Sequence, residues 1–110
     1  MTETIRIAVF RLNAPVSFET IPNELEDMSG IVGGYIEVLP IGGGLILTCN
    51  EDGKRYQLAP TRTLLRSGIV DNVVGTFFVA RKDGDEYASI KPADEARLTA
   101  WTPGGVWTVE

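Results

Sequence analysis

The chain has 110 residues, of which 44% are hydrophobic and 23% are charged, and its formal net charge is −5. These values are typical of one globular domain and unlike those of a disordered chain. No apolar stretch approaches the ~18 residues of a membrane-spanning helix, and the N-terminal segment lacks the basic-then-apolar order of a signal peptide. We therefore expect a single cytoplasmic domain over residues 1–110, with no membrane binding. The negative charge argues against direct binding of nucleic acid, which needs a basic face.

The chemistry available to the chain is limited by what its composition lacks. There is no histidine, and Cys49 is the only cysteine. Serine–histidine and cysteine–histidine pairs and histidine-ligated zinc sites are therefore excluded within this chain. We expect no cofactor and no metal. We interpret Cys49 as a buried structural cysteine, because the nearby Glu51 and Asp52 raise the pKa of a thiol and so disfavour its reactive form.

The N-terminal third predicts a β-hairpin followed by a short helix. Residues 4–10 and 16–20 alternate in the period-2 pattern of strands. In residues 23–32 the apolar residues Leu25, Met28 and Val32 fall on one helical face. Asn23 is the expected N-cap, with Glu26 completing a capping box. Two glycines at 33–34 suit the left-handed conformation that ends a helix.

The middle of the chain predicts a meander of about three antiparallel strands. Residues 35–40 (YIEVLP) form the first strand, and a glycine-rich turn leads to its partner at 44–50 (GLILTCN). NEDG then reads as a turn before a third short strand, KRYQL. Residues 59–72 show no clear periodicity, and one helical turn and an ordered loop are the alternatives there. Pro60 argues against a central strand there.

The C-terminal third predicts a buried strand over residues 73–81 (VVGTFFVAR), because it is rich in β-branched and aromatic residues. An acidic DG turn and a return strand (EYASI) follow. Pro92 suits the first position of a helix over residues 92–101. The tail forms either a small extra strand or a segment that packs Trp107 on the sheet. The predicted fold class is α+β: a mainly antiparallel twisted sheet of about five to six strands with two short helices.

Four motifs, GGYIE at 33–37, CNEDGK at 49–54, PTR at 60–62 and VGTFFVA at 74–80, resemble one family at matching spacing. It is the family of the domain of unknown function 3846, small proteins found mainly in phages, prophages and some bacteria. The resemblance covers about residues 4–101 and leaves the tail 102–110 outside it. Lys91-Pro92 departs from the threonine cap usual in relatives. The resemblance implies a phage-like context and no defined activity.

Four residues are candidates for binding: Tyr35, Glu37, Asn50 and Arg62. Arg62 lies in a proline-bounded loop, where it pairs with Glu37 or a carbonyl near Asn50, or else contacts a partner or an anion. Tyr35 is expected to be half core and half contact surface. Asn50 belongs to the NEDG turn, which lacks the residue order of an EF-hand.

The leading functional hypothesis is a phage-type accessory protein that binds a host or phage protein in the bacterial cytoplasm, without catalysis. Homodimerisation through an edge strand is a secondary expectation. One alternative is an enzyme or ligand-binding module in which Glu37, Glu51 or Asp52 acts with Tyr35 or Arg62 in a concave site. Another is mimicry of DNA, in which spaced carboxylates occupy the phosphate sites of a nucleic-acid-binding protein.

Overall fold

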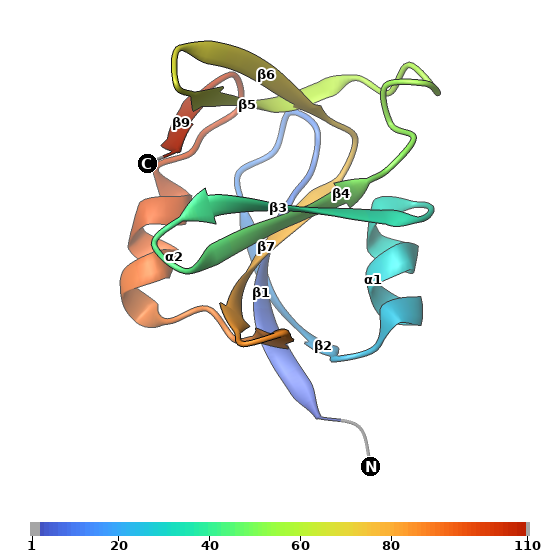
Figure 1. Ribbon diagram of the computed structural model, residues 1–110, viewed down its shortest axis with the longest axis vertical. Coiled ribbons are helices and arrows are strands. Elements are labelled where there is room, and N and C mark those ends of the chain that lie inside the picture. Colours follow the sequence, from blue (N-terminus) through green and yellow to red (C-terminus); the bar gives the residue numbers. More distant parts are fainter. Residues whose placement is uncertain (1–2, 110) are drawn as a thin grey trace.

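The computed structural model describes residues 3–109, whose strands and two helices are drawn in Figure 1. Their bounds are β1 Thr4–Phe10, β2 Ser17–Pro22, α1 Leu25–Val32, β3 Ile36–Gly42, β4 Leu45–Asn50, β5 Pro60–Arg66, β6 Ile69–Val74, β7 Phe77–Asp83, β8 Glu86–Ala88, α2 Pro92–Thr99 and β9 Val106–Val109. The predicted α+β class is confirmed, as one compact domain. No helix within residues 3–109 is both long and apolar enough to cross a membrane.

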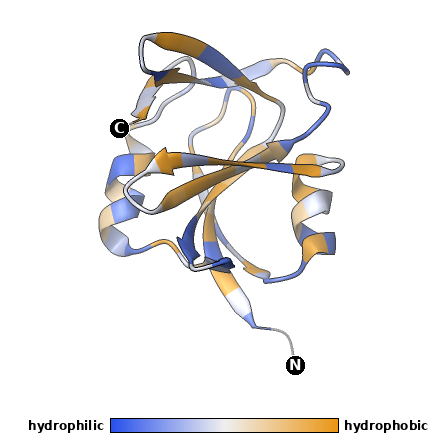
Figure 2. Ribbon diagram, in the orientation of Figure 1, coloured by the Kyte–Doolittle hydropathy of each residue, from blue (hydrophilic) through white to orange (hydrophobic). Residues whose placement is uncertain are grey.

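The larger sheet has six strands and is antiparallel throughout. Its order is β2-β1-β7-β4-β3, and β8 pairs with the end of β7. The predicted hairpins of β1 with β2 and of β3 with β4 are both confirmed. β3 continues through Pro40 to Gly42 with a bulge between these two residues, so it is longer than the predicted strand. Figure 2 shows the central strands of this sheet as largely hydrophobic.

The smaller sheet has three strands in the order β6-β5-β9, and it corrects two predictions. Residues 59–72, expected to form a helical turn or a loop, instead supply β5 and most of β6. Pro60 is the first residue of β5, a position where its missing N–H does no harm. The expected strand 73–81 is divided, because Gly75 adopts a positive φ of 73° and separates β6 from β7.

Both structures predicted as alternatives for the tail occur together. β9 pairs in parallel with β5, and Trp107 is buried. The indole N–H of Trp107 donates a hydrogen bond to the Ile41 carbonyl of β3 at 2.9 Å. The tail therefore links the smaller sheet to the larger one, although it lies outside the expected extent of the family resemblance.

Helix α1 is shorter than predicted at its start. Its N-cap is Glu24 rather than Asn23, and no side chain caps it. Met28 and Val32 are buried, as expected, but Leu25 in the first turn is 63% exposed. Gly33 ends the helix in the left-handed conformation, with φ 81°, which confirms the expected role of the glycine pair.

Alternation along the larger sheet produces two separate cores. Phe77 faces a core with Phe10, Leu98 and Trp101, which α2 and the smaller sheet cover, whereas its neighbour Phe78 faces the core under α1. Four aromatic rings pack together in the first core, and the stacked pair Phe10–Phe77 has a centroid distance of 4.8 Å. The predicted helix over 92–101 is confirmed as α2, with Pro92 in its first turn.

The predicted third strand of the central meander, KRYQL, is wrong. Residues 51–57 form consecutive turns instead. The Tyr56 amide donates to the Asp52 carbonyl and the Leu58 amide donates to the Gly53 carbonyl, both at 3.0 Å. Figure 2 shows this segment as largely hydrophilic. The loop leads directly from β4 of the larger sheet into β5 of the smaller one.

Candidate functional site

The four motif segments meet where the two sheets join. The Glu51 amide donates to the Tyr35 carbonyl at 2.8 Å, which links the CNEDGK segment to GGYIE. The Gly75 amide donates to the Ala59 carbonyl at 2.9 Å, and the Thr61 hydroxyl donates to the Gly75 carbonyl at 2.6 Å. These bonds connect PTR to VGTFF. The motifs are therefore joined by hydrogen bonds in two pairs, GGYIE with CNEDGK and PTR with VGTFF.

Asn50 holds the end of α1 against the loop that follows β4. Its side-chain amide donates to the Val32 carbonyl at 3.2 Å, and its amide oxygen accepts the Asp52 N–H at 2.8 Å. A Cβ at Gly34 would lie only 3.0 Å from the Asn50 amide nitrogen, so a larger residue there would force the Asn50 side chain to shift. The polar atoms of Asn50 thus organise the site from within.

Leu58 packs on a second close approach. A Cβ at Gly75 would lie 2.7 Å from Cδ1 of Leu58, and the positive φ of Gly75 disfavours any other residue. Leu58 therefore sits directly on the backbone between β6 and β7. This contact forms the floor of a surface groove.

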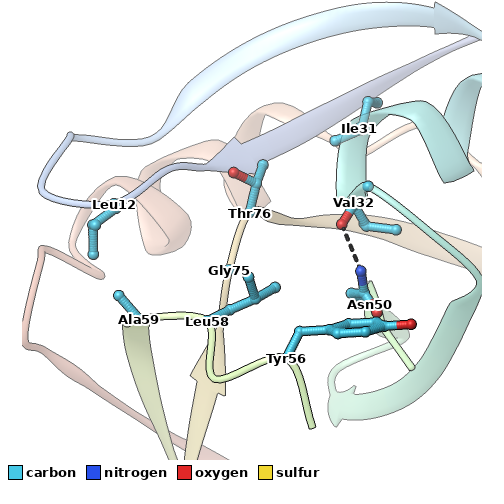
Figure 3. A pocket seen from close by; sticks show the side chains of 10 residues that line it. Leu12, Ile31, Val32, Asn50, Tyr56, Leu58, Ala59, Gly75 and Thr76 are labelled. Atoms are coloured by element: carbon cyan, nitrogen blue, oxygen red, sulfur yellow. Dashed lines mark hydrogen bonds between the residues drawn. The ribbon is translucent and has the colours of Figure 1, made fainter. Parts of the chain in front are cut away.

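The apolar groove, as we name it, has a volume of about 470 Å³. Its lining comes from the β1–β2 loop, the end of α1, the end of β4, the 51–59 loop and the β6–β7 turn: Leu12, Ile31, Val32, Gly33, Asn50, Tyr56, Leu58, Ala59, Gly75 and Thr76. Figure 3 shows Leu12 and Asn50 at opposite ends, with Leu58 and Tyr56 between them. None of the lining residues is an acid, a base or a cysteine. The groove therefore presents a mainly apolar surface.

A second hollow adjoins the groove and shares Gly33, Asn50 and Tyr56 with it. We name it the tyrosine depression; it has a volume of about 280 Å³, and its other lining residues are Ser29, Gly34, Tyr35 and Asp52. Tyr35 is 78% exposed and Tyr56 is 64% exposed. Both rings are therefore available to a partner, and Tyr35 is more exposed than the half-core position expected for it.

A third hollow, the carboxylate depression, is smaller, at about 160 Å³. It contains Glu37, Asn50 and Glu51 together with Cys49, Lys54, Asp71 and other residues of β3, β4 and β6. Lys54 forms an ion pair with Asp71. Across residues 3–109, no group of three or more histidine, cysteine, aspartate or glutamate side chains is arranged to hold a metal ion.

Cys49 is buried at the edge of this depression. Burial, together with the negative charges of Glu37 and Asp71, raises the pKa of its thiol to about 11. At pH 8 only roughly one thiol in a thousand is then a thiolate, the reactive form. The interpretation of Cys49 as a structural residue is thus supported, although the charges responsible differ from the Glu51 and Asp52 named from the sequence.

Arg62 lies away from all three hollows and is only 1% exposed. Its guanidinium donates to the carbonyls of Trp101 at 2.9 Å, Thr61 at 3.0 Å and Ala14 at 2.7 Å. It also lies over the Phe10 ring, 5.2 Å from the centroid. The expected pairing with Glu37 or with a carbonyl near Asn50 is therefore not what the structure shows. Arg62 fixes the β1–β2 loop and the end of α2 to β5.

The structure brings the four candidate residues together only in part. Tyr35 and Asn50 share the tyrosine depression, whereas Glu37 shares the carboxylate depression with Asn50. Residues that the sequence did not single out form much of the groove, namely Leu12, Tyr56, Leu58 and Thr76. One feature of the sequence could have identified Tyr56. It is an aromatic residue in an otherwise polar segment, where burial in a core does not account for it.

Asp94 and Glu95, one of the acid clusters considered for DNA mimicry, are paired with arginines, and acids outside those clusters are also paired with basic residues. Asp94 accepts two hydrogen bonds from Arg81, and Glu95 accepts two from Arg6. Asp71 and Glu19 also form ion pairs. Burial on its own raises the pKa of Asp94, but the hydrogen bonds from Arg81 and from the Lys91 amide outweigh it and hold that pKa below its ordinary value. Carboxylates engaged in this way are less free to imitate phosphates.

A comparison with protein families identifies the family of the chain. The model of the domain of unknown function DUF3846 matches residues 5–102. The chain belongs to the DUF3846 family. No curated protein and no solved structure matches it. The resemblance inferred from the motifs is therefore correct, and the matched region ends before β9, so the pairing of β9 with β5 lies outside the DUF3846 match.

Proposed function

We propose that this DUF3846 domain is a non-enzymatic accessory protein, acting in a phage or prophage context by binding a host or phage protein during host takeover or counter-defence. The observation that carries the proposal is the apolar groove. Its lining contains no aspartate, glutamate, lysine or arginine, and the exposed side chains of Leu12 and Tyr56 stand at its rim. Protein interfaces are enriched in such aromatic and apolar residues around a desolvated centre.

The shape of the groove favours a protein over a small substrate. Sites for small molecules usually bury most of the ligand and place a few polar groups at its reactive atoms. Here Leu12 is 49% exposed and Tyr56 is 64% exposed, so the rim is open to solvent. The polar side chain of Asn50 is already engaged by Val32 and Asp52.

The arrangement of ionisable groups gives the enzyme alternative less support. It requires Glu37, Glu51 or Asp52 to act with Tyr35 or Arg62 at one centre. Of these pairs, only Asp52 and Tyr35 line the same hollow. Glu37 and Tyr35 line different hollows. Arg62 is buried among backbone carbonyls beside the core that α2 and the smaller sheet cover. The carboxylate depression retains Glu37 and Glu51 beside Lys54, but its volume of about 160 Å³ is well below that of ordinary ligand sites.

A pull-down from bacterial host lysate tests the proposal, with matched surface variants of the tagged chain. Leu12→Asp places a charge at the rim of the apolar groove, and Ile69→Asp places one on an exposed apolar residue of β6. Quantitative mass spectrometry should find a protein that is enriched by wild type and by Ile69→Asp, and that falls at least about tenfold with Leu12→Asp. Retention of every captured protein by Leu12→Asp would contradict the proposal.

Homodimerisation through an edge strand stays a prediction. β3 is an edge of the larger sheet and exposes Val38, as a pairing strand would. The Arg66 guanidinium donates to the Pro40 carbonyl at 2.6 Å, so part of this edge is already occupied by the smaller sheet. Sedimentation equilibrium at increasing concentration should show a dimer whose formation is weakened by Val38→Lys.

A further inference from the structure

The tyrosine depression differs in chemistry from the groove that it adjoins. It combines the two exposed rings of Tyr35 and Tyr56 with the half-buried carboxylate of Asp52. None of its lining residues is a lysine or an arginine, and within residues 3–109 Asp52 takes part in no ion pair. Its carboxylate therefore forms no salt bridge with a cation of the described residues.

The end of α1 adds to this negative character. Ser29 and Gly33, which line the depression, belong to the last turns and the C-cap of the helix. The C-terminal end of a helix carries a partial negative charge from its carbonyl groups. The faces of tyrosine rings also attract cations. Three independent features thus favour a positive group at this position.

We propose that the tyrosine depression receives an arginine side chain of the partner protein while an apolar side chain of the same segment enters the apolar groove. A planar guanidinium stacks on aromatic rings and pairs with a carboxylate, and it is more weakly hydrated than an ammonium group. The two hollows share the wall formed by Asn50 and Tyr56, so one short segment reaches both. This inference rests on the proposed function and specifies the chemistry of the partner.

Charge complementarity supports a basic partner segment. The chain has a net charge of −5, and Glu51 lies next to Asp52 at the start of the 51–57 turns. In an extended peptide, residues i and i+2 point to the same side about 7 Å apart. A segment with arginine and leucine separated by one residue therefore presents both side chains to this surface.

Synthetic peptides and nuclear magnetic resonance test the inference directly. The probe is acetyl-Gly-Arg-Gly-Leu-Gly-amide, and its control contains citrulline, the neutral counterpart of arginine. Titration of ¹⁵N-labelled protein with the arginine peptide should shift the amide signals of residues 33–35 and 50–58. The citrulline peptide should bind about three- to tenfold more weakly, since it lacks the cation.

Matched variants assign the effect to the proposed residues. Asp52→Asn should weaken the arginine peptide about three- to tenfold and leave the citrulline peptide unchanged. Asp83→Asn removes the same charge at the far end of β7 and should change neither peptide. Tyr35→Phe should retain binding and Tyr35→Leu should weaken it, because the ring face rather than the hydroxyl attracts the cation. Melting temperatures confirm that each variant is folded.

The outcomes separate this inference from the proposed function. Equal binding of the arginine and citrulline peptides, or equal effects of Asp52→Asn and Asp83→Asn, would overturn the arginine site and leave an apolar docking groove in place. Absence of any shift with the arginine peptide would also overturn it. A partner that Leu12→Asp loses and Asp52→Asn retains would support the proposed function alone.

Discussion

The two faces of the six-stranded sheet are covered to different extents. On one face, α2 and the smaller sheet enclose the rings of Phe10, Phe77, Trp101 and Trp107, whose centroids lie 4.8–5.5 Å apart in contacting pairs. On the other face lies the eight-residue helix α1, and the end of this helix borders two open hollows. The core of the first region is closed by aromatic packing, although the smaller sheet also exposes Ile69 and Val70 beside a hollow of about 460 Å³. The second region leaves the two hollows at the end of α1 open.

Hydrogen bonds and charges follow the same division. Arg62, Arg81 and Arg6 on the α2 side all use their guanidinium groups within the fold. On the α1 side, Tyr35 and Tyr56 are exposed and Asp52 has no ion pair within the described residues. Charged and aromatic contacts within the fold are therefore concentrated on the α2 side, whereas exposed tyrosine rings lie on the α1 side.

Removing a ring from the aromatic core should give the largest effect on stability. Trp101→Ala deletes a buried indole that contacts three other rings. It should lower the free energy of unfolding by about 3–5 kcal/mol, as measured by urea denaturation. Tyr35→Ala, the matched change on the α1 side, should cost less than about 0.5 kcal/mol. Similar losses in the two variants would refute the division of the molecule into a closed and an open side.

Arg62→Met should be the next most damaging change. It retains much of the side-chain volume but leaves three backbone carbonyls without their charged donor. The expected loss is about 3 kcal/mol, since unsatisfied buried acceptors are costly. Arg66→Met on the same strand removes a single exposed hydrogen bond and serves as the control. A loss for Arg62→Met no greater than that for Arg66→Met would contradict the anchoring role of Arg62.

The ion pair of Asp94 with Arg81 should make part of the stability depend on pH. Because the folded-state pKa of Asp94 is lowered, the native state binds fewer protons than the unfolded chain. The contribution is therefore complete above the unfolded pKa of about 4 and is lost as pH falls through the folded pKa. Asp94→Asn should cost about 2 kcal/mol at pH 7, and its difference from wild type should shrink below about pH 4.

Urea denaturation at pH 7 and pH 3 measures this dependence. Asp83→Asn, an exposed acid at the end of β7, provides a control for the general effect of removing a charge. A difference between wild type and Asp94→Asn that stays constant across this range would show that the carboxylate charge does not stabilise the fold.

Local signals in the sequence were sufficient for the elements whose pattern is unbroken. The alternation in residues 4–10, the glycine at 33 and the proline at 92 predicted β1, the end of α1 and the start of α2. Tertiary contacts decided the rest. β5 forms in spite of Pro60 because β6 and β9 pair with it on both sides. Periodicity within one segment cannot reveal such partners.

The site was less predictable than the fold, because its residues are brought together by contacts distant in sequence. Asn50 and Tyr35 were recognised from their motifs, but the groove depends on the packing of Leu58 against Gly75. Arg62 was singled out correctly as unusual and was assigned the wrong partners. Its three acceptors are backbone carbonyls, which carry no signature in a sequence.

Site-specific photo-crosslinking in host cells tests the accessible α1 side most directly. p-Benzoylphenylalanine is placed at Tyr56 in one variant and at Val106, an exposed residue of β9, in another. We expect a discrete heavier adduct after irradiation only for the variant at Tyr56, together with a free energy of unfolding within about 0.5 kcal/mol of wild type. An adduct confined to the variant at Val106, or none at Tyr56, would contradict docking through this side of the sheet.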